Sequence, residues 1–312
     1  MLLIVVLALG AALLYGTADF FSGVAARRIA VLAATTINYA VATVVLVIVV
    51  LTVGGVWSPT AIASGVTAGL LAAVGFLTFT AALAAGPISL LTPLIALLSS
   101  AVPVVVALVL GDQLEPIAWV AVVVAILGSV LIGLERRVDT RSAKPRTLLF
   151  AAISGLAFGF ATVALDLAPA DAGMVAVFLD TTSGLVLLLV LVGLARGVPA
   201  MRRAMAVLDA HPVDDEQATT PGAAPRGAVP PADPRRRARL LAGAAGLLIG
   251  GANVLLMLAL HEGSVAVVAV LVNLYPVATV LLAWIVLRER INAVQGTGVV
   301  LAVAASVMLG LV

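Results

Sequence analysis

Residues 65–76 read Gly-Val-Thr-Ala-Gly-Leu-Leu-Ala-Ala-Val-Gly-Phe, and residues 242–253 read Ala-Gly-Ala-Ala-Gly-Leu-Leu-Ile-Gly-Gly-Ala-Asn. The shared Gly-Leu-Leu begins at 69 and again 177 residues later, at 246, and this offset aligns all of 65–134 with 242–311 without a gap. About 19 of the 70 aligned pairs are identical, more than a composition rich in Ala, Val and Leu gives by coincidence. A repeat of this length is typical of a duplicated bundle of membrane helices, which many secondary transporters contain.

The composition places the chain in the membrane. It is 63% hydrophobic and 10% charged, with a mean hydropathy of +1.26, whereas charged residues make up about a quarter of a soluble globular domain. Apolar runs of about 20 residues recur along the chain, each long enough to cross roughly 30 Å of hydrocarbon as a helix. Because the runs are continuously apolar rather than alternating, they indicate helices and not a barrel. The sequence therefore predicts an all-α polytopic membrane protein.

Ten transmembrane helices are expected. Turn residues and charges separate them into spans near 2–25, 31–53, 61–84, 87–110, 116–134, 147–167, 172–194, 240–260, 264–287 and 293–311. The first 23 residues lack a basic segment and a small-x-small cleavage site, which predicts a retained first span. Two halves with five spans each have to lie upside down relative to one another, so the sequence predicts two inverted five-helix repeats. The expected domains are a first repeat at 1–134, a cytoplasmic linker at 135–146 and a second repeat at 147–312.

The basic residues indicate the orientation of these spans. All 17 Lys and Arg residues lie in alternate connections, after the first, fifth, seventh and ninth spans. The other connections carry only acids, which are Asp112, Glu115, Asp166, Asp171 and Glu262. Basic residues near span ends stay in the cytoplasm. This pattern predicts a multi-pass protein of the plasma (inner) membrane with both termini extracytoplasmic, and it explains the basic pI of 9.5 without nucleic-acid binding.

The connection at 195–239 differs from the short ones elsewhere. It contains five prolines between 221 and 234 and the acidic run Asp214-Asp215-Glu216. Such a composition cannot bury a core, so we expect a disordered cytoplasmic insert that acts as a linker, or alternatively has a regulatory role. Within it, residues 201–208 have the pattern of a short basic amphipathic helix on the inner surface.

Two acidic residues lie deep inside the predicted spans. Asp19 is eight residues before Arg27 and Asp180 is nine residues after Asp171, so each lies about 12–13 Å from the nearer boundary at 1.5 Å per residue. An ionisable group at this depth costs at least ~2.5–3.5 kcal/mol, and no Lys or Arg lies inside a span to pair with it. We expect one of the two, Asp19 ahead of Asp180, to bind and release a coupling proton. The alternative is a neutral or amide-bonded carboxyl that joins two helices.

Further polar groups at middle depth are candidates for substrate binding. They are Asn38, Tyr39, Asn253, Asn273 and Tyr275. The two asparagines of the second half lie in adjacent predicted spans, so their amides are expected to approach one another. The alternative for each is a hydrogen bond to a neighbouring helix, worth about 0.6–2 kcal/mol in membranes.

Prolines inside two spans predict opened helices. Pro93 and Pro103 lie in the fourth span and Pro276 in the ninth, and each removes a helix hydrogen bond and frees a carbonyl. A kinked helix from each half would form a cavity wall, although a bend that serves packing is the alternative. Gly65-x-x-x-Gly69 and Gly246-x-x-x-Gly250 have the spacing of close helix contacts, and we interpret them as packing positions.

Several classes of site are not supported by the residues present. The chain has no cysteine, which excludes disulfides and thiolate chemistry. No Gly-x-x-x-x-Gly-Lys-Ser/Thr occurs, and the two histidines, His211 and His261, lie in different connections. We therefore expect no enzymatic activity, no cofactor and no metal.

Short motifs recur in both halves. Leu13-Leu14-Tyr15-Gly16-Thr17 opens the first half, and Leu156-Ala157-Phe158-Gly159 stands at the matching place in the second. Pro103 is followed by Gly111-Asp112-Gln113-Leu114, and Pro276 by Arg288-Glu289-Arg290-Ile291. In this duplicated order the chain resembles the drug/metabolite transporter superfamily, in its ten-helix branch with two EamA-like repeats. Tyr15 in place of Trp, Asp112 in place of Glu and Ala121 in place of Gly depart from the family pattern.

The resemblance implies transport of small metabolites, commonly export of amino acids or related compounds, through a central cavity lined chiefly by helices 3, 4, 8 and 9. Together with the two acids it predicts a proton-coupled secondary transporter that works by alternating access, as a monomer or homodimer in the lipid bilayer. The alternatives are an importer or facilitator of a sugar, nucleoside or osmolyte, and a lipid flippase or non-transporting membrane protein. The substrate itself is not evident from the sequence.

Overall fold

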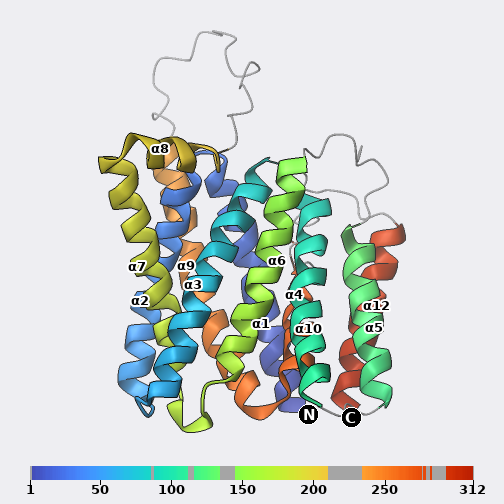
Figure 1. Ribbon diagram of the computed structural model, residues 1–312. Coiled ribbons are helices and arrows are strands. Elements are labelled where there is room, and N and C mark those ends of the chain that lie inside the picture. The colour runs from blue at the N-terminus through green and yellow to red at the C-terminus, as the bar shows by residue number, and fades with distance from the viewer. Residues whose placement is uncertain are drawn as a thin grey trace, which may run out of the picture.

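The computed structural model describes residues 2–85, 88–111, 116–133, 145–209, 234–275, 277–278, 282 and 293–311. Every regular element in these residues is a helix, and the long helices run side by side in one bundle (Figure 1). They are α1 (Leu2–Ala26), α2 (Val31–Val53), α3 (Pro59–Ala85), α4 (Ile88–Leu110), α5 (Pro116–Gly133), α6 (Pro145–Asp166), α7 (Val175–Gly197), α9 (Pro234–Glu262) and α12 (Ala293–Leu311). Three short elements accompany them: η2 (Ala170–Ala172), α8 (Pro199–Ala206) and α10 (Val265–Val272).

The lengths of the helices match a membrane protein. Within the described ranges, six helices are long and apolar enough to cross a bilayer, namely α1, α2, α3, α6, α7 and α9. The predicted ninth span, 264–287, is described only in part, as α10 and the turn that follows it. The predicted linker at 135–146 lies outside the described residues except for its last two, which begin α6 at Pro145.

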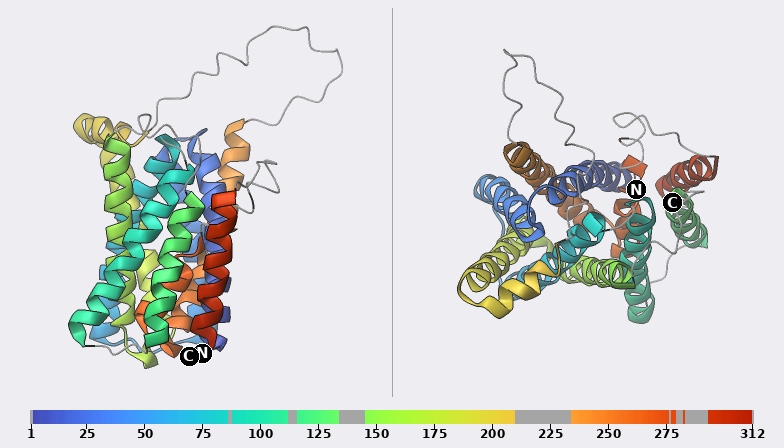
Figure 2. Two further views of the ribbon diagram at one scale, coloured as in Figure 1. Left: turned by 90° about the vertical axis from the view of Figure 1, so that its right-hand side faces the viewer. Right: turned by 90° about the horizontal axis from the view of Figure 1, so that it is seen from above.

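Helices that are far apart in the sequence form the main contacts of the bundle. The most extensive contacts are between α1 and α9 and between α3 and α6. α2 packs against α9, and α7 packs against α3. α5 and α12 pack against each other at one edge of the bundle (Figures 1 and 2). The cores of all these contacts consist mainly of Ala, Val and Leu side chains.

Glycines set the closest of these contacts. A Cβ placed on Gly69 of α3 would lie 1.9 Å from the backbone oxygen of Asp180 in α7, and one on Gly246 of α9 would lie 2.5 Å from the backbone oxygen of Asn38 in α2. These two glycines are equivalent under the 177-residue repeat. The interpretation of the Gly-x-x-x-Gly stretches as packing positions is therefore confirmed.

Three parts of the insert expected at 195–239 are helical. Residues 195–197 complete α7, α8 follows at Pro199–Ala206, and α9 begins at Pro234, six residues before the predicted span. Proline suits the first position of a helix because its missing N–H needs no partner there, and this explains the early start of α9. The remaining residues of the insert, 210–233, lie outside the described residues. α8 has no buried side chain and crosses the end of the bundle (Figure 1), as expected of a surface helix.

Candidate functional site

A cavity of about 130 Å³ lies in the middle of the bundle. Its described lining comes from α1, α2, α3, α4, α6, α7, α9, α10 and the turn after α10. The first, second, sixth and seventh spans therefore contribute as well, and the lining is wider than the four helices that the family resemblance implied. Helices of both halves of the chain enclose this one space.

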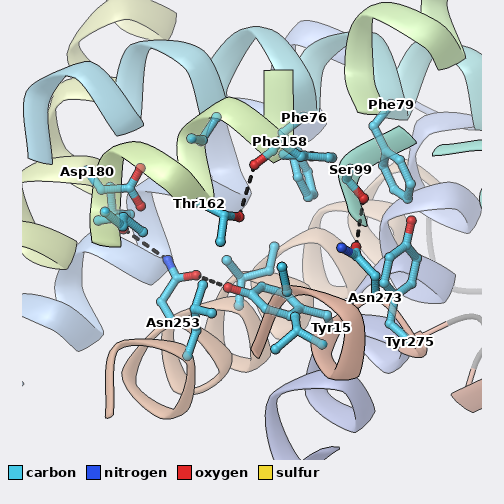
Figure 3. A pocket seen from close by; sticks show the side chains of 18 of the residues that line it. Tyr15, Phe76, Phe79, Ser99, Phe158, Thr162, Asp180, Asn253, Asn273 and Tyr275 are labelled. Carbon is cyan, nitrogen blue, oxygen red and sulfur yellow. Dashed lines mark hydrogen bonds between the residues drawn. The ribbon is translucent and has the colours of Figure 1, made fainter. Parts of the chain in front are cut away.

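One chain of hydrogen bonds crosses the cavity wall. The hydroxyl of Tyr15 in α1 donates to Oδ1 of Asn253 in α9, and the amide nitrogen of Asn253 donates to the hydroxyl of Thr181 in α7, at 3.1 Å. Figure 3 shows Tyr15 and Asn253 pointing toward one another. The chain joins helices from the two halves and orients the Asn253 amide, whose residue is 8% exposed.

A second pair of polar groups joins α4 to the turn after α10. The hydroxyl of Ser99 donates to Oδ1 of Asn273 at 2.7 Å, and Asn273 caps the end of α10. Tyr275 lines the cavity beside this pair and packs against Ala96 and Tyr15 (Figure 3). Asn253 and Asn273 thus line the same cavity and bond to different partners.

Both deep acids line the cavity. Asp19 in α1 is 7% exposed and Asp180 in α7 is 6% exposed. Oδ1 of Asp180 is buried without a hydrogen-bond partner. Tyr15 lines the same cavity as both carboxyl groups. Two residues 161 positions apart in the sequence therefore face one space, which sequence spacing alone does not reveal.

Aromatic rings form the opposite part of the lining. Phe76 and Phe79 of α3 and Phe158 of α6 pack with ring centroids 5.8–6.3 Å apart. Tyr39 of α2 meets Phe76 edge to face at 6.0 Å. Figure 3 shows this phenylalanine group across the cavity from Tyr15 and Asn253. The cavity is amphipathic: one wall is aromatic, and the other carries amide and hydroxyl groups.

Of the predicted site residues, six face this cavity: Asp19, Tyr39, Asp180, Asn253, Asn273 and Tyr275. Asn38 is not among the lining residues; it is fully buried, and its amide nitrogen donates to the hydroxyl of Ser22 in α1 at 3.0 Å. That bond matches the alternative of a helix–helix contact.

The predicted kink prolines have different positions. Pro93 and Pro103 lie within α4, which is helical from Ile88 to Leu110, and Pro103 is buried away from the cavity lining. Pro276 lies outside the described residues. The helix before it does open: α10 ends at Val272, and Asn273 and Leu274 form a turn at the cavity.

The sequence prediction left out several lining residues, above all Tyr15, Thr181 and Phe158. Tyr15 and Phe158 stand at matching places in the two aromatic-Gly motifs, but those motifs were interpreted as features of the fold only. The scarcity of tyrosine was a usable signal, because the chain has three tyrosines and all of them line the cavity. Thr181 carried no such signal, since a threonine in a span commonly bonds to its own helix, as Thr181 also does to Val177.

Comparisons with known proteins agree with this architecture. The model of the EamA-like transporter family matches residues 2–134 and 221–311, which confirms the resemblance drawn from the motifs. A solved crystal structure, described only as that of a protein, is similar over 99% of this chain and 96% of its own, with 16% identity and a TM-score of 0.63. At this identity the likeness shows the fold alone. A search of curated proteins found no match.

Proposed function

Because the chain belongs to the EamA-like transporter family, and is thus a multi-pass membrane transporter of small molecules, we propose that it exports a small amphipathic metabolite by proton-coupled alternating access. The observation that carries this proposal is the cavity in the middle of the bundle, whose described lining comes from both halves of the chain. A transporter of this kind needs one central site that two structural units can expose in turn. The family contains transporters and not enzymes.

The pairing of the helices supports two inverted repeats. If α1 to α5 form one unit and α6 to α12 the other, the contact of α1 with α9 corresponds to the contact of α6 with α3. The contact of α2 with α9 corresponds in the same way to that of α7 with α3. In this scheme nine of the ten spans are the long helices α1 to α7, α9 and α12. The remaining span, which is the ninth along the chain, begins with α10. Rocking of one unit against the other then opens the cavity to either side.

The two carboxyl groups that line the cavity support proton coupling. Asp19 and Asp180 are buried, and a buried carboxyl is stable either as the neutral acid or beside a positive charge. A carboxyl that faces a transport cavity alternates between these states when it meets the two sides of the membrane. Asp19 is our first candidate for the coupling residue, with Asp180 second.

The orientation rests on the charges at the ends of the helices. The described arginines near helix ends lie just after α1, in the last turn of α7 and in the first turns of α6 and α9, and all of these ends lie at the end of the bundle that carries α8 (Figure 1). We assign this end to the cytoplasm. The N- and C-terminal helices then begin and end on the extracytoplasmic side of the plasma membrane.

Metabolite profiling of bacterial cells tests the proposal without assuming a substrate. Cells that express the wild-type protein should accumulate one or more small metabolites in the medium, and an uncoupler that collapses the proton gradient should abolish the accumulation. Asp19→Asn should abolish it as well, whereas Asp171→Asn, outside the cavity in η2, should not.

Each alternative has its own outcome in this experiment. Depletion of a compound from the medium would identify an importer, and accumulation indifferent to both the uncoupler and Asp19→Asn would exclude proton coupling. An unchanged profile, with purified protein moving labelled lipid between the leaflets of liposomes, would identify a flippase.

A further inference from the structure

The charge of the cavity constrains its ligand. Asp19 and Asp180 line it, and none of the described lining residues is Lys, Arg or His. Both acids are at least nine-tenths buried. A buried carboxylate is stable only with an opposite charge or several hydrogen bonds. Because the described lining supplies no positive charge, the counter-charge comes from a proton or from the ligand.

Asp180 has an acceptor for such a ligand. Its Oδ1 is buried without a hydrogen-bond partner. Three nearby donors bond elsewhere: Tyr15 donates to Asn253, Asn253 donates to Thr181, and the Thr181 hydroxyl donates to the backbone oxygen of Val177. In Figure 3, Asp180 lies nearer to Asn253 than to Tyr15. An N–H group of a bound ammonium would supply the missing donor in a charge-assisted hydrogen bond.

The aromatic residues of the chain are concentrated at the same place. Aromatic residues make up only 4% of the sequence, yet six described lining residues are aromatic. They are Tyr15, Tyr39, Phe76, Phe79, Phe158 and Tyr275. The face of an aromatic ring attracts a cation electrostatically, most strongly when the cation is out of water. Aromatic rings beside carboxylates are the combination by which proteins recognise ammonium groups.

The end of α10 adds a further negative potential. α10 runs from Val265 to Val272, and Val272 and Asn273 at its C-terminal end line the cavity. The C-terminus of a helix carries a partial negative charge. The helix end therefore also favours a cation.

A ligand carboxylate would meet the opposite conditions. It would face two acidic side chains and a helix C-terminus, with only hydroxyl and amide donors in the described lining to receive it. Like charges a few ångströms apart repel strongly in a medium of low dielectric constant. The cavity of about 130 Å³ holds on the order of ten waters at roughly 10–15 Å³ each, so the ligand has about that number of non-hydrogen atoms.

We propose that the transported metabolite is a small amphipathic amine, bound as an ammonium cation between Asp180, Asp19 and the aromatic rings, and that it carries no carboxylate. This inference rests on the proposed transport function and narrows its substrate class. It differs from the amino acids that the family resemblance implied, because a free amino acid carries the carboxylate that this lining disfavours.

Matched compounds test the inference on the purified full-length protein in lipid nanodiscs. Three series share a side group and differ in charge: phenethylamine, phenylalanine and phenethyl alcohol; tryptamine, tryptophan and tryptophol; isopentylamine, leucine and isopentyl alcohol. Calorimetric titration at neutral pH should give, in at least one series, a dissociation constant for the amine about tenfold or more below those of the amino acid and the alcohol. The amine should also raise the thermal unfolding temperature.

Variants locate the binding site. Asp180→Asn should weaken binding of the amine about tenfold or more, because it removes the charge and keeps the size. Asp171→Asn, the same change outside the cavity, should leave the dissociation constant unchanged. Phe76→Leu, which removes a ring and keeps an apolar side chain, should weaken the amine more than the alcohol. These comparisons use only variants whose unfolding temperature matches that of the wild type. The three compound series are measured on the wild-type protein and do not depend on the variants.

Three outcomes would overturn the inference: an amino acid or alcohol that binds as tightly as its amine, amine binding that Asp180→Asn does not affect, or no binding of any amine in the three series. The proposed function has a separate readout in the exported metabolites. Export of zwitterions or anions would overturn the present inference and leave the transporter in place. Amine binding without export of any compound would overturn the transport function and leave the site in place.

Discussion

At the residue scale, several polar side chains inside the bundle bond to side chains of other helices. Tyr15 bonds to Asn253, Asn253 to Thr181, Ser99 to Asn273 and Asn38 to Ser22. Burial in an apolar environment makes an unpaired polar group costly, so each pair restricts how its helices rotate about their axes. The pairs that face the cavity thus have two roles, since they hold helices together and orient groups toward a ligand.

A double-mutant cycle tests the bond between Tyr15 and Asn253. Tyr15→Phe and Asn253→Leu should each lower the free energy of unfolding in mixed micelles, and the double variant should lose less than the sum. We expect a coupling energy of about 0.6–1.7 kcal/mol, the range measured for hydrogen bonds between membrane helices. The control pair is Tyr15→Phe with Ser99→Ala, whose hydroxyl bonds to Asn273 instead. If the losses in unfolding free energy at Tyr15 and Asn253 are additive, as those of the control pair should be, the result would contradict the bond.

At the scale of helices, small residues decide which elements touch. Gly65 and Gly69 bring α3 onto α7, and Gly246 and Gly250 bring α9 onto α2. Backbones can approach this closely only where no Cβ intervenes, and dispersion contacts then stabilise helix pairs that have no hydrophobic driving force in lipid. The approach of α3 to the backbone of Asp180 also places that carboxyl beside the cavity.

Substitution of one glycine tests this packing. A Cβ at Gly69 would lie 1.9 Å from the backbone oxygen of Asp180 and 2.2 Å from the hydroxyl of Ser183, so Gly69→Ala should force α3 and α7 apart. We expect a loss of about 1–3 kcal/mol or more and a lower thermal unfolding temperature in detergent. Gly243→Ala in α9 is the matched control, because a Cβ there meets nothing within 4 Å. Its unfolding temperature should stay the same or rise slightly, since alanine favours the helix. Equal unfolding temperatures for the two variants would refute the packing role of Gly69.

At the scale of the whole molecule, the two ends of the bundle differ in charge. The described arginines near helix ends gather at the end of the bundle that carries α8. The opposite end of the bundle carries the acidic residues Asp166, Asp171 and Glu262. Basic residues are retained in the cytoplasm during insertion, so the charge difference determines which end faces the cell interior. The side of the membrane that each end of the bundle faces depends on this orientation.

Single cysteines test the orientation directly, because the wild-type chain contains none. Ala170→Cys in η2 and Ala206→Cys in α8 are exposed positions at opposite ends of the bundle. A membrane-impermeant maleimide added to intact cells should label Ala170→Cys, and it should label Ala206→Cys only after the membrane is permeabilised. The wild-type protein should not react under either condition. The reverse labelling pattern would place the termini in the cytoplasm.

Sequence and structure contributed differently to the candidate site. The depth of Asp19, Asp180, Asn253 and Asn273 followed from counting residues to the nearest charge, and all four line the cavity. Counting does not indicate which way a side chain points, so Asn38 has a similar depth and yet bonds to Ser22. The aromatic wall was not anticipated, because a phenylalanine in an apolar span looks the same whether it faces lipid, protein or a cavity.

The sequence by itself determined the class and the family of this protein, because apolar length, charge position and the 177-residue repeat are properties of consecutive residues. Only the tertiary structure decided that Asp19 and Asp180 share one space, that Tyr15 bonds to Asn253, and that the tyrosines gather around the two acids. These relations depend on how each helix is rotated and on which distant helix it meets. Both are set by close packing at small residues and by pairing of buried polar groups, and neither leaves a periodic signal in an almost wholly apolar chain.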